Sequence, residues 1–126
     1  ARNLLVAFNI NLDSSDIRAA RRIAKKIRTA GGGLPCVKAL GVFLASRNMA
    51  QVSMNLTDFR VTAPQAAFDA VQAEAAAEGI SIRSTQLVGL IPDTAVAPDG
   101  DAFRLCEDFG EHRILERCLE AAFRLP

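Results

Sequence analysis

Hydrophobic and polar residues alternate along two stretches of the chain, with the period of two that is typical of a half-buried β-strand. The first stretch runs from Leu4 to Leu12 and the second from Met49 to Leu56. Residues 37–44 and 80–89 are predicted as two further strands. Ser46, Arg47 and Asn48 form the predicted turn between the second and third strands, so these two strands are expected to make a hairpin.

Two other segments show the three-four spacing of amphipathic helices. The first runs from Ile17 to Ile27, and Gly31 to Gly33 are expected to end it. Candidate cap residues precede this helix: Asp13, Ser14 and Ser15. The second helix is predicted to begin at Pro64 and to run to about Glu78, before Gly79.

The resulting order of elements is β-α-β-β-α-β, which predicts an α+β, ferredoxin-like fold. In this fold, two helices cover one face of a four-stranded antiparallel sheet and leave the other face open. A loop marked by Pro92, Pro98 and Gly100 follows the fourth strand. Residues 101–123 are then expected to form one or two more helices, broken near Gly110, within a single domain that spans residues 1–126.

The composition agrees with one folded domain. The chain has 126 residues, of which 50% are hydrophobic and 23% charged, which excludes intrinsic disorder. The longest apolar run without charge, Asn3 to Leu12, is far shorter than the roughly 20 residues that a bilayer crossing requires. The chain begins with alanine and shows no secretory leader. We therefore expect a piece of a longer, soluble, cytoplasmic protein.

Charge is distributed unevenly. Residues 1–50 carry nine Lys or Arg and two Asp, whereas residues 51–126 carry six Lys or Arg and twelve Asp or Glu. Six of the nine basic residues in 1–50 lie in the first predicted helix or directly after it: Arg18, Arg21, Arg22, Lys25, Lys26 and Arg28. Such a helix could gather an anionic ligand, and it could equally be a solvated face.

Several common kinds of site are not supported. Cys36, Cys106 and Cys118 fit neither a disulfide framework nor a zinc knuckle, and His112 is the only histidine, so we expect no metal. The glycines at 31–33 follow a helix, whereas a phosphate-binding loop precedes one. Asp58 is expected to be a turn residue. The open face carries no aromatic residue on which an RNA base could stack, so no nucleic-acid partner is expected.

The strongest signal comes from the polar positions of the first and third strands, which lie side by side in this topology. Their open face should carry five neutral donor-acceptor side chains: Asn9, Asn11, Gln51, Ser53 and Asn55. Amides offer both donors and acceptors and do not titrate, so they suit binding rather than proton transfer. A ligand site, a contact with another domain and a solvated sheet face all agree with this pattern.

Three segments resemble a known family in order and spacing: Ala7 to Leu12 (AFNINL), Asn48 to Phe59 (NMAQVSMNLTDF) and Thr85 to Pro92 (TQLVGLIP). Together they are similar to the C-terminal subdomain of glutamate formimidoyltransferase over about residues 1–92. The resemblance implies a role in histidine breakdown. Enzymes of this family transfer the formimino group of N-formimino-L-glutamate to tetrahydrofolate, and the folate binds between two subdomains.

The same resemblance implies that the catalytic histidine belongs to the N-terminal subdomain, outside this chain, and that tetrahydrofolate is a co-substrate. The residues that match the folate-side wall are Asn9, Asn11, Gln51, Ser53, Asn55, Gln86 and Gly89. Residues 93–126 diverge and are expected to be a helical tail, to which the resemblance assigns no site residue. The expected partners are the N-terminal subdomain, folate and formiminoglutamate, and the resemblance leaves a homodimer open. The alternative hypothesis is a non-catalytic ferredoxin-like binding or oligomerisation module.

Overall fold

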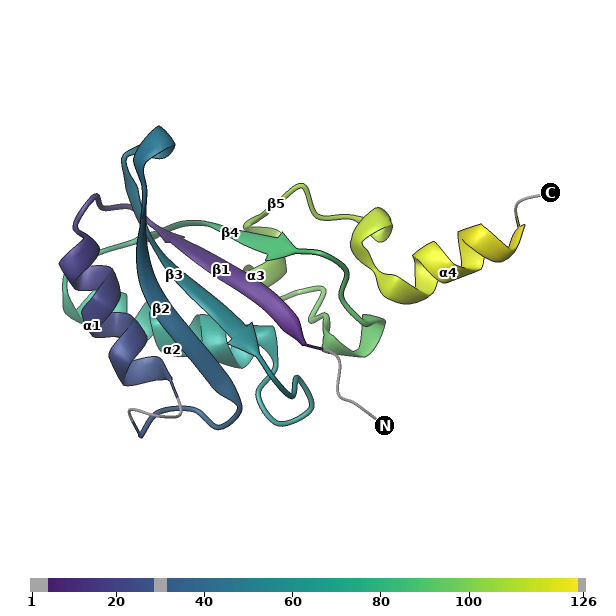
Figure 1. The fold of residues 1–126 in the computed structure, drawn as a ribbon, viewed down its shortest axis with the longest axis horizontal. Coiled ribbons are helices and arrows are strands. Elements are labelled where there is room, and N and C mark those ends of the chain that lie inside the picture. Colours follow the sequence, from purple (N-terminus) through teal and green to yellow (C-terminus); the bar gives the residue numbers. More distant parts are fainter. Residues whose placement is uncertain (1–4, 29–31, 125–126) are drawn as a thin grey trace.

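The computed structural model describes residues 5–28 and 32–124, which form a sheet with helices packed on it (Figure 1). The six predicted strands and helices are all present: β1 (Val6–Leu12), α1 (Ile17–Ile27), β2 (Val37–Leu44), β3 (Met49–Leu56), α2 (Pro64–Ala77) and β4 (Ile82–Val88). The predicted elements are therefore confirmed, with ends that differ by at most two residues within the described ranges. Leu4 lies outside the described residues, as do residues 29–31.

The strands form one sheet in the order β2-β3-β1-β4-β5. The three pairings among β1 to β4 are antiparallel, which confirms the ferredoxin-like arrangement. The fifth strand, β5 (Cys106–Glu107), was not predicted, and it pairs with β4 in the parallel direction. The predicted sheet of four strands is thus wrong in one respect, since a short fifth strand extends the edge beside β4.

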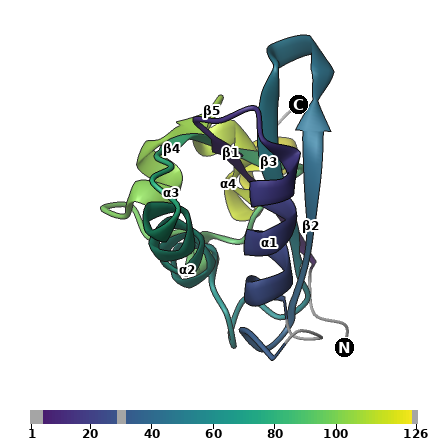
Figure 2. The same cartoon turned by 90° about the vertical axis from the view of Figure 1, so that its left-hand side faces the viewer.

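Helices α1 and α2 lie side by side against one face of the sheet (Figure 2). The strand residues that point toward them form the core, and those of β1 are fully buried: Val6, Phe8, Ile10 and Leu12. Phe68 and Val71 of α2 are buried against this layer. The packing of α1 on β2 is close at Gly41, where an added Cβ would lie 2.5 Å from the backbone nitrogen of Arg21. Glycine is required there for the helix to reach the sheet.

The ends of α1 differ from the expectation. Asp16, rather than Asp13, Ser14 or Ser15, is the N-cap, and its carboxylate accepts a hydrogen bond from the backbone N–H of Arg18. The helix ends at Ile27, before the glycines. Asp58 is confirmed as a turn residue, because its side chain accepts from the backbone N–H of Arg60.

The segment after β4 has the expected helices on either side of Gly110, but it is not helical throughout. It contains the short helix α3 (Asp101–Arg104), then β5, and finally α4 (Leu115–Arg124). Thr85 of β4 fixes this segment, since its backbone N–H donates to the carbonyl of Leu105 and its hydroxyl donates to the carbonyl of Ala102. Helix α4 extends away from the sheet (Figure 1). None of the helices in the described part of the chain is long and apolar enough to cross a membrane.

Candidate functional site

The polar side chains of the central strands gather on the sheet face opposite α1 and α2, which we call the amide face. Its members are Asn9, Asn11, Gln51, Ser53, Asn55, Ser84 and Gln86. The strand registers set them in rows. Asn9 lies between Ser53 of β3 and Gln86 of β4. Asn11 lies one step along, between Gln51 and Ser84. The structure therefore brings together all the predicted site residues except Gly89.

One end of the amide face is closed by hydrogen bonds between its own side chains. Gln51 donates from Nε2 to Oδ1 of Asn11 over 2.8 Å, and Asn11 donates from Nδ2 to the hydroxyl of Ser84 over 2.9 Å. Asn11 is 0% exposed and Gln51 only 4%. The prediction that the whole face is uncovered is therefore wrong at this end. Buried amides of this kind are part of the folded structure, because each would be costly to leave without a partner.

Glu107 of β5 completes this end and was missed by the sequence analysis. Its Oε2 accepts from the Ser84 hydroxyl over 2.6 Å and from Nδ2 of Asn11 over 3.3 Å. Arg47, from the tip of the β2–β3 hairpin, donates to both of its carboxylate oxygens over 3.1 and 2.9 Å. The Arg47 guanidinium, followed by the Ser84 hydroxyl, lowers the pKa of Glu107 below its ordinary value. Glu107 is therefore ionised and held in place near neutral pH.

We call the group formed by Asn11, Gln51, Ser84, Glu107 and Arg47 the locked end of the amide face. Ser84 could have been found from the sequence, because it continues the alternation that contains Gln86. Glu107 could not, since it lies in a charged stretch that the sequence assigns to a helix. Only the parallel pairing of β5 with β4 brings its carboxylate beside Asn11.

The other end of the amide face has hydrogen-bonding capacity to spare, and we call it the open end: Asn9, Ser53 and Asn55. Asn9 donates to Oε1 of Gln86 over 3.2 Å, but its own carbonyl oxygen accepts no bond from the residues that the structure describes. The same holds for the Ser53 hydroxyl and the Asn55 amide, which make no side-chain hydrogen bond within residues 5–28 and 32–124. Asn55 is exposed and Ser53 half-buried.

Gly89, the remaining predicted site residue, follows β4 with a φ of 82°. Its carbonyl accepts hydrogen bonds from Nε and Nη2 of Arg113 over 3.0 and 2.9 Å. Arg113 also donates to the carbonyl of Leu87. The observed contacts of Gly89 thus attach the segment before α4 to the end of β4.

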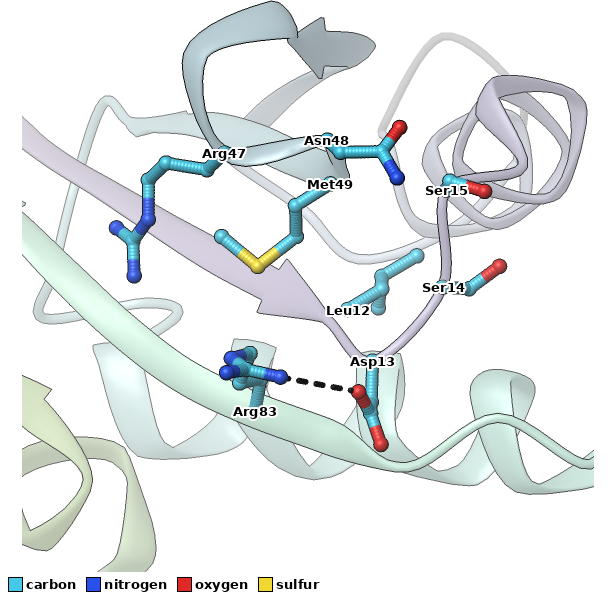
Figure 3. A pocket seen from close by; sticks show the side chains of 8 residues that line it. All are labelled: Leu12, Asp13, Ser14, Ser15, Arg47, Asn48, Met49 and Arg83. Carbon is cyan, nitrogen blue, oxygen red and sulfur yellow. Dashed lines mark hydrogen bonds and ion pairs between the residues drawn. The ribbon is translucent and has the colours of Figure 1, made fainter.

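A polar cavity of about 300 Å³ lies beyond the locked end, between the hairpin tip and the loop that follows β1 (Figure 3). Its lining residues are Leu12, Asp13, Ser14, Ser15, Arg47, Asn48, Met49 and Arg83. Arg47 belongs both to this lining and to the locked end. The cavity and the amide face are therefore adjacent.

His112 and Cys106 take no part in the side-chain hydrogen bonds of this network within the described residues. His112 contacts Asp108, with 3.3 Å between Nε2 and Oδ1, in the short turn before α4. Burial raises the pKa of the Cys106 thiol, which disfavours a thiolate nucleophile. Across the described residues, no cluster of three or more His, Cys, Asp or Glu side chains is placed to hold a metal ion.

Comparison with known proteins gives one consistent family. A family model described as a formiminotransferase domain matches residues 7–109. The chain is 40% identical to glutamate formimidoyltransferase of Thermoplasma acidophilum over 122 residues, which cover 97% of this chain and 40% of that relative. It is 41% identical to the Streptococcus pyogenes serotype M1 enzyme of the same name over 120 residues, which cover 94% of this chain and 40% of that enzyme. It is 42% identical to the formimidoyltransferase-cyclodeaminase of Mus musculus over 109 residues, which cover 82% of this chain and 20% of that protein. The chain thus spans about 40% of the length of the first two relatives.

Proposed function

The chain belongs to the formiminotransferase domain family, and from that premise we propose that it is the folate-contacting part of a cytoplasmic glutamate formimidoyltransferase. The complete enzyme would transfer the formimino group of N-formimino-L-glutamate to tetrahydrofolate, in histidine degradation. The observation that carries this proposal is the open end of the amide face. At that end, the carbonyl oxygen of Asn9, the hydroxyl of Ser53 and the amide of Asn55 have no hydrogen-bond partner among the described residues, so they are available to a ligand.

The chemistry of the open end suits a pterin ring. The edge of such a heterocycle carries N–H donors beside nitrogen and oxygen acceptors, so its partners must supply both kinds of group. Asn55 offers an amide N–H₂ and a carbonyl oxygen, the Ser53 hydroxyl can donate and accept, and Asn9 offers its carbonyl oxygen. These groups fit tetrahydrofolate as a co-substrate. Gln86 supports the site by holding the amide of Asn9 in one orientation.

The side chains of the amide face are unsuited to proton transfer. Amides do not titrate, and the Glu107 carboxylate is held in its ionised form by Arg47 and Ser84. A carboxylate with a lowered pKa is a weak base, and it has no proton to donate near neutral pH. The contribution of this chain is therefore to bind and orient the folate. The general acid or base would come from an N-terminal part that the relatives' greater length allows.

A second candidate function rests on the apolar residues around the same face. Leu40 of β2 is 60% exposed, Val88 of β4 is 54% exposed and Leu5 is 50% exposed. Exposed side chains of this size suit a protein partner. A non-catalytic binding or oligomerisation module would use them to dimerise, whereas the formimidoyltransferase would use them against its N-terminal part.

An assay of a chimeric enzyme distinguishes the two candidate functions. The matching 40% of the Thermoplasma acidophilum enzyme is replaced by this chain, and formimino transfer from formiminoglutamate to tetrahydrofolate is measured. The chimera is expected to turn over, whereas the isolated chain is expected to show none. Proton transfer by a positioned group accelerates reactions about 10²–10⁴-fold, and the isolated chain lacks it. A folded chimera without activity, together with a dimeric isolated chain, would favour the second function. Steady turnover by the isolated chain would contradict the proposal that an N-terminal part supplies the acid or base.

A further inference from the structure

The side chains that line the cavity beyond the locked end carry more positive than negative charges. Of its eight lining residues, Arg47 and Arg83 carry positive charge and only Asp13 carries negative charge. In Figure 3, the two guanidinium groups lie on one side of the cavity, and Ser14, Ser15 and Asn48 lie on the other. We call this cavity the arginine pocket.

Neither guanidinium uses all its donors. A guanidinium has five N–H donors. Arg83 makes one hydrogen bond within the described ranges, from Nη1 to Oδ1 of Asp13 over 3.3 Å. Arg47 uses Nη1 and Nη2 on Glu107, and its Nε–H donates to no other described residue. The hydrogen-bond donors that remain therefore favour an anionic ligand.

The bond between Arg83 and Asp13 is easily exchanged. The Arg83 side chain is 62% exposed and that of Asp13 59%. Exposed ion pairs contribute little to stability because water screens them and their long side chains lose entropy. An incoming anion can thus take the place of Asp13 on Arg83. Arg47 is different, because it makes two hydrogen bonds to Glu107, and Ser84 and Asn11 in turn hold that carboxylate.

We propose that the arginine pocket binds the carboxylate end of a glutamyl group. This inference rests on the proposed function, because both N-formimino-L-glutamate and folate end in such a group. The planar fork of Arg83 matches the two oxygens of a carboxylate. The Nε–H of Arg47 and the side chains of Ser15 and Asn48 provide further polar partners. Arg47 thereby links the pocket to the network of the amide face.

The test is an NMR titration of the purified chain with three probes: N-formimino-L-glutamate, folate, and 6-methylpterin, which carries the pterin ring and no carboxylate. Shifts at Ser15, Asn48 and Arg83 are expected with the glutamyl probes and not with 6-methylpterin. Binding of formiminoglutamate assigns the pocket to the amino-acid substrate. Binding of folate alone assigns it to the folate tail. No shift with either glutamyl probe up to millimolar concentrations, or equal shifts with inorganic phosphate, would overturn the proposal.

Two variants change affinity in opposite directions. Arg83→Gln should weaken binding of the glutamyl probe about tenfold, because a hydrogen bond to a charged group is lost. Asp13→Asn removes the competing carboxylate, so it should tighten binding, an effect that structural damage cannot imitate. Arg18→Gln is the matched control. Arg18 pairs with Asp16, is 80% exposed and does not line the pocket, so its replacement should leave affinity unchanged. Weaker binding in Asp13→Asn would overturn the proposal.

The titration of the arginine pocket and the chimera assay can fail independently of each other. If Arg83→Gln leaves glutamyl binding unchanged while the chimera still transfers the formimino group, the pocket assignment fails and the function stands. If the pocket binds glutamyl groups and the folded chimera is inactive, the pocket stands and the function fails.

Discussion

The two ends of the amide face carry the same kinds of side chain and use them differently. At the locked end, Asn11 and Gln51 are buried and bonded to each other, and Asn11 also bonds to Ser84 and Glu107. At the open end, Ser53 and Asn55 make no side-chain hydrogen bond within the described part of the chain. A row of amides on a strand is therefore not by itself a binding surface. Burial and pairing decide which amides hold the fold and which are available to a ligand.

The difference originates in two segments that approach the sheet from outside it. The hairpin tip supplies Arg47, and β5 supplies Glu107, so that the locked end gains a charge pair above its amides. Within the described residues, no comparable segment covers Asn55, which pairs with Lys38 of β2 and Ala7 of β1 in the strand registers. The comparison predicts effects on stability at one end and on ligand affinity at the other.

The largest effect on stability is expected from Asn11→Ala. The change leaves the Nε2 of the buried Gln51 without its acceptor, and it removes the donors to the half-buried Ser84 hydroxyl and to Glu107. Buried polar groups without partners cost about 1–3 kcal/mol each, so the free energy of unfolding should fall by about 2–4 kcal/mol. Urea denaturation of the isolated chain measures it. Asn55→Ala is the control and should change stability by no more than about 0.5 kcal/mol. Equal effects of the two changes would remove the distinction between the ends.

For folate affinity, by contrast, the larger effect is expected from changes at the open end. In the active chimera, Asn55→Ala should weaken tetrahydrofolate binding by about 1–3 kcal/mol, because a polar atom of the ligand loses its partner on binding. Ser53→Ala should have a smaller effect in the same direction, since it removes one hydroxyl. Fluorescence or calorimetric titration gives the dissociation constants. An unchanged affinity in both variants would mean that the open end is a solvated surface.

The sequence predicts the open end better than the locked end for a physical reason. Alternation along 49–56 places Ser53 and Asn55 on the polar face, and local periodicity suffices for that. The burial of Asn11 depends on Glu107, which is 96 residues away in sequence. A strand of two residues carries no periodicity, and its parallel pairing with β4 is decided by long-range contacts such as Thr85 with Ala102 and Leu105. Sequence patterning therefore identifies the face but not the group that closes half of it.

The locked end also makes stability depend on pH. The pKa of Glu107 is lowered in the folded chain, chiefly by Arg47, from an ordinary value of 4.5. Its stabilising contribution is therefore fully present above that ordinary value, and it is lost as the pH falls through the lowered folded-state pKa. The Glu107 side chain is 35% exposed, so screening limits the contribution to about 1 kcal/mol.

Glu107→Gln should remove this dependence. Urea midpoints measured from neutral pH into the acid range should fall less steeply for the variant than for the parent chain. Glu78 provides the control, because Arg22 lowers its pKa in a similar exposed pair that lies away from the amide face. Glu78→Gln should leave the contribution of Glu107 intact. Parallel pH profiles for Glu107→Gln and the parent would show that the carboxylate does not hold the locked end together.

The smallest effect is expected from the basic residues of α1. The sequence allows them to gather an anionic folate tail, but α1 packs on one face of the sheet (Figure 2), and the amides belong to the opposite face. Arg22 and Lys26 are paired with Glu78 and Glu74 of α2. Exposed charges are screened beyond about 10 Å at 0.1 M salt, so little attraction should reach the open end. Replacing Arg21 and Lys25 by Gln should then change folate affinity in the chimera by less than about twofold at that ionic strength. A larger loss that grows with the number of glutamates in the tail would place part of the folate site on α1 and make the amide face only one of two contact surfaces.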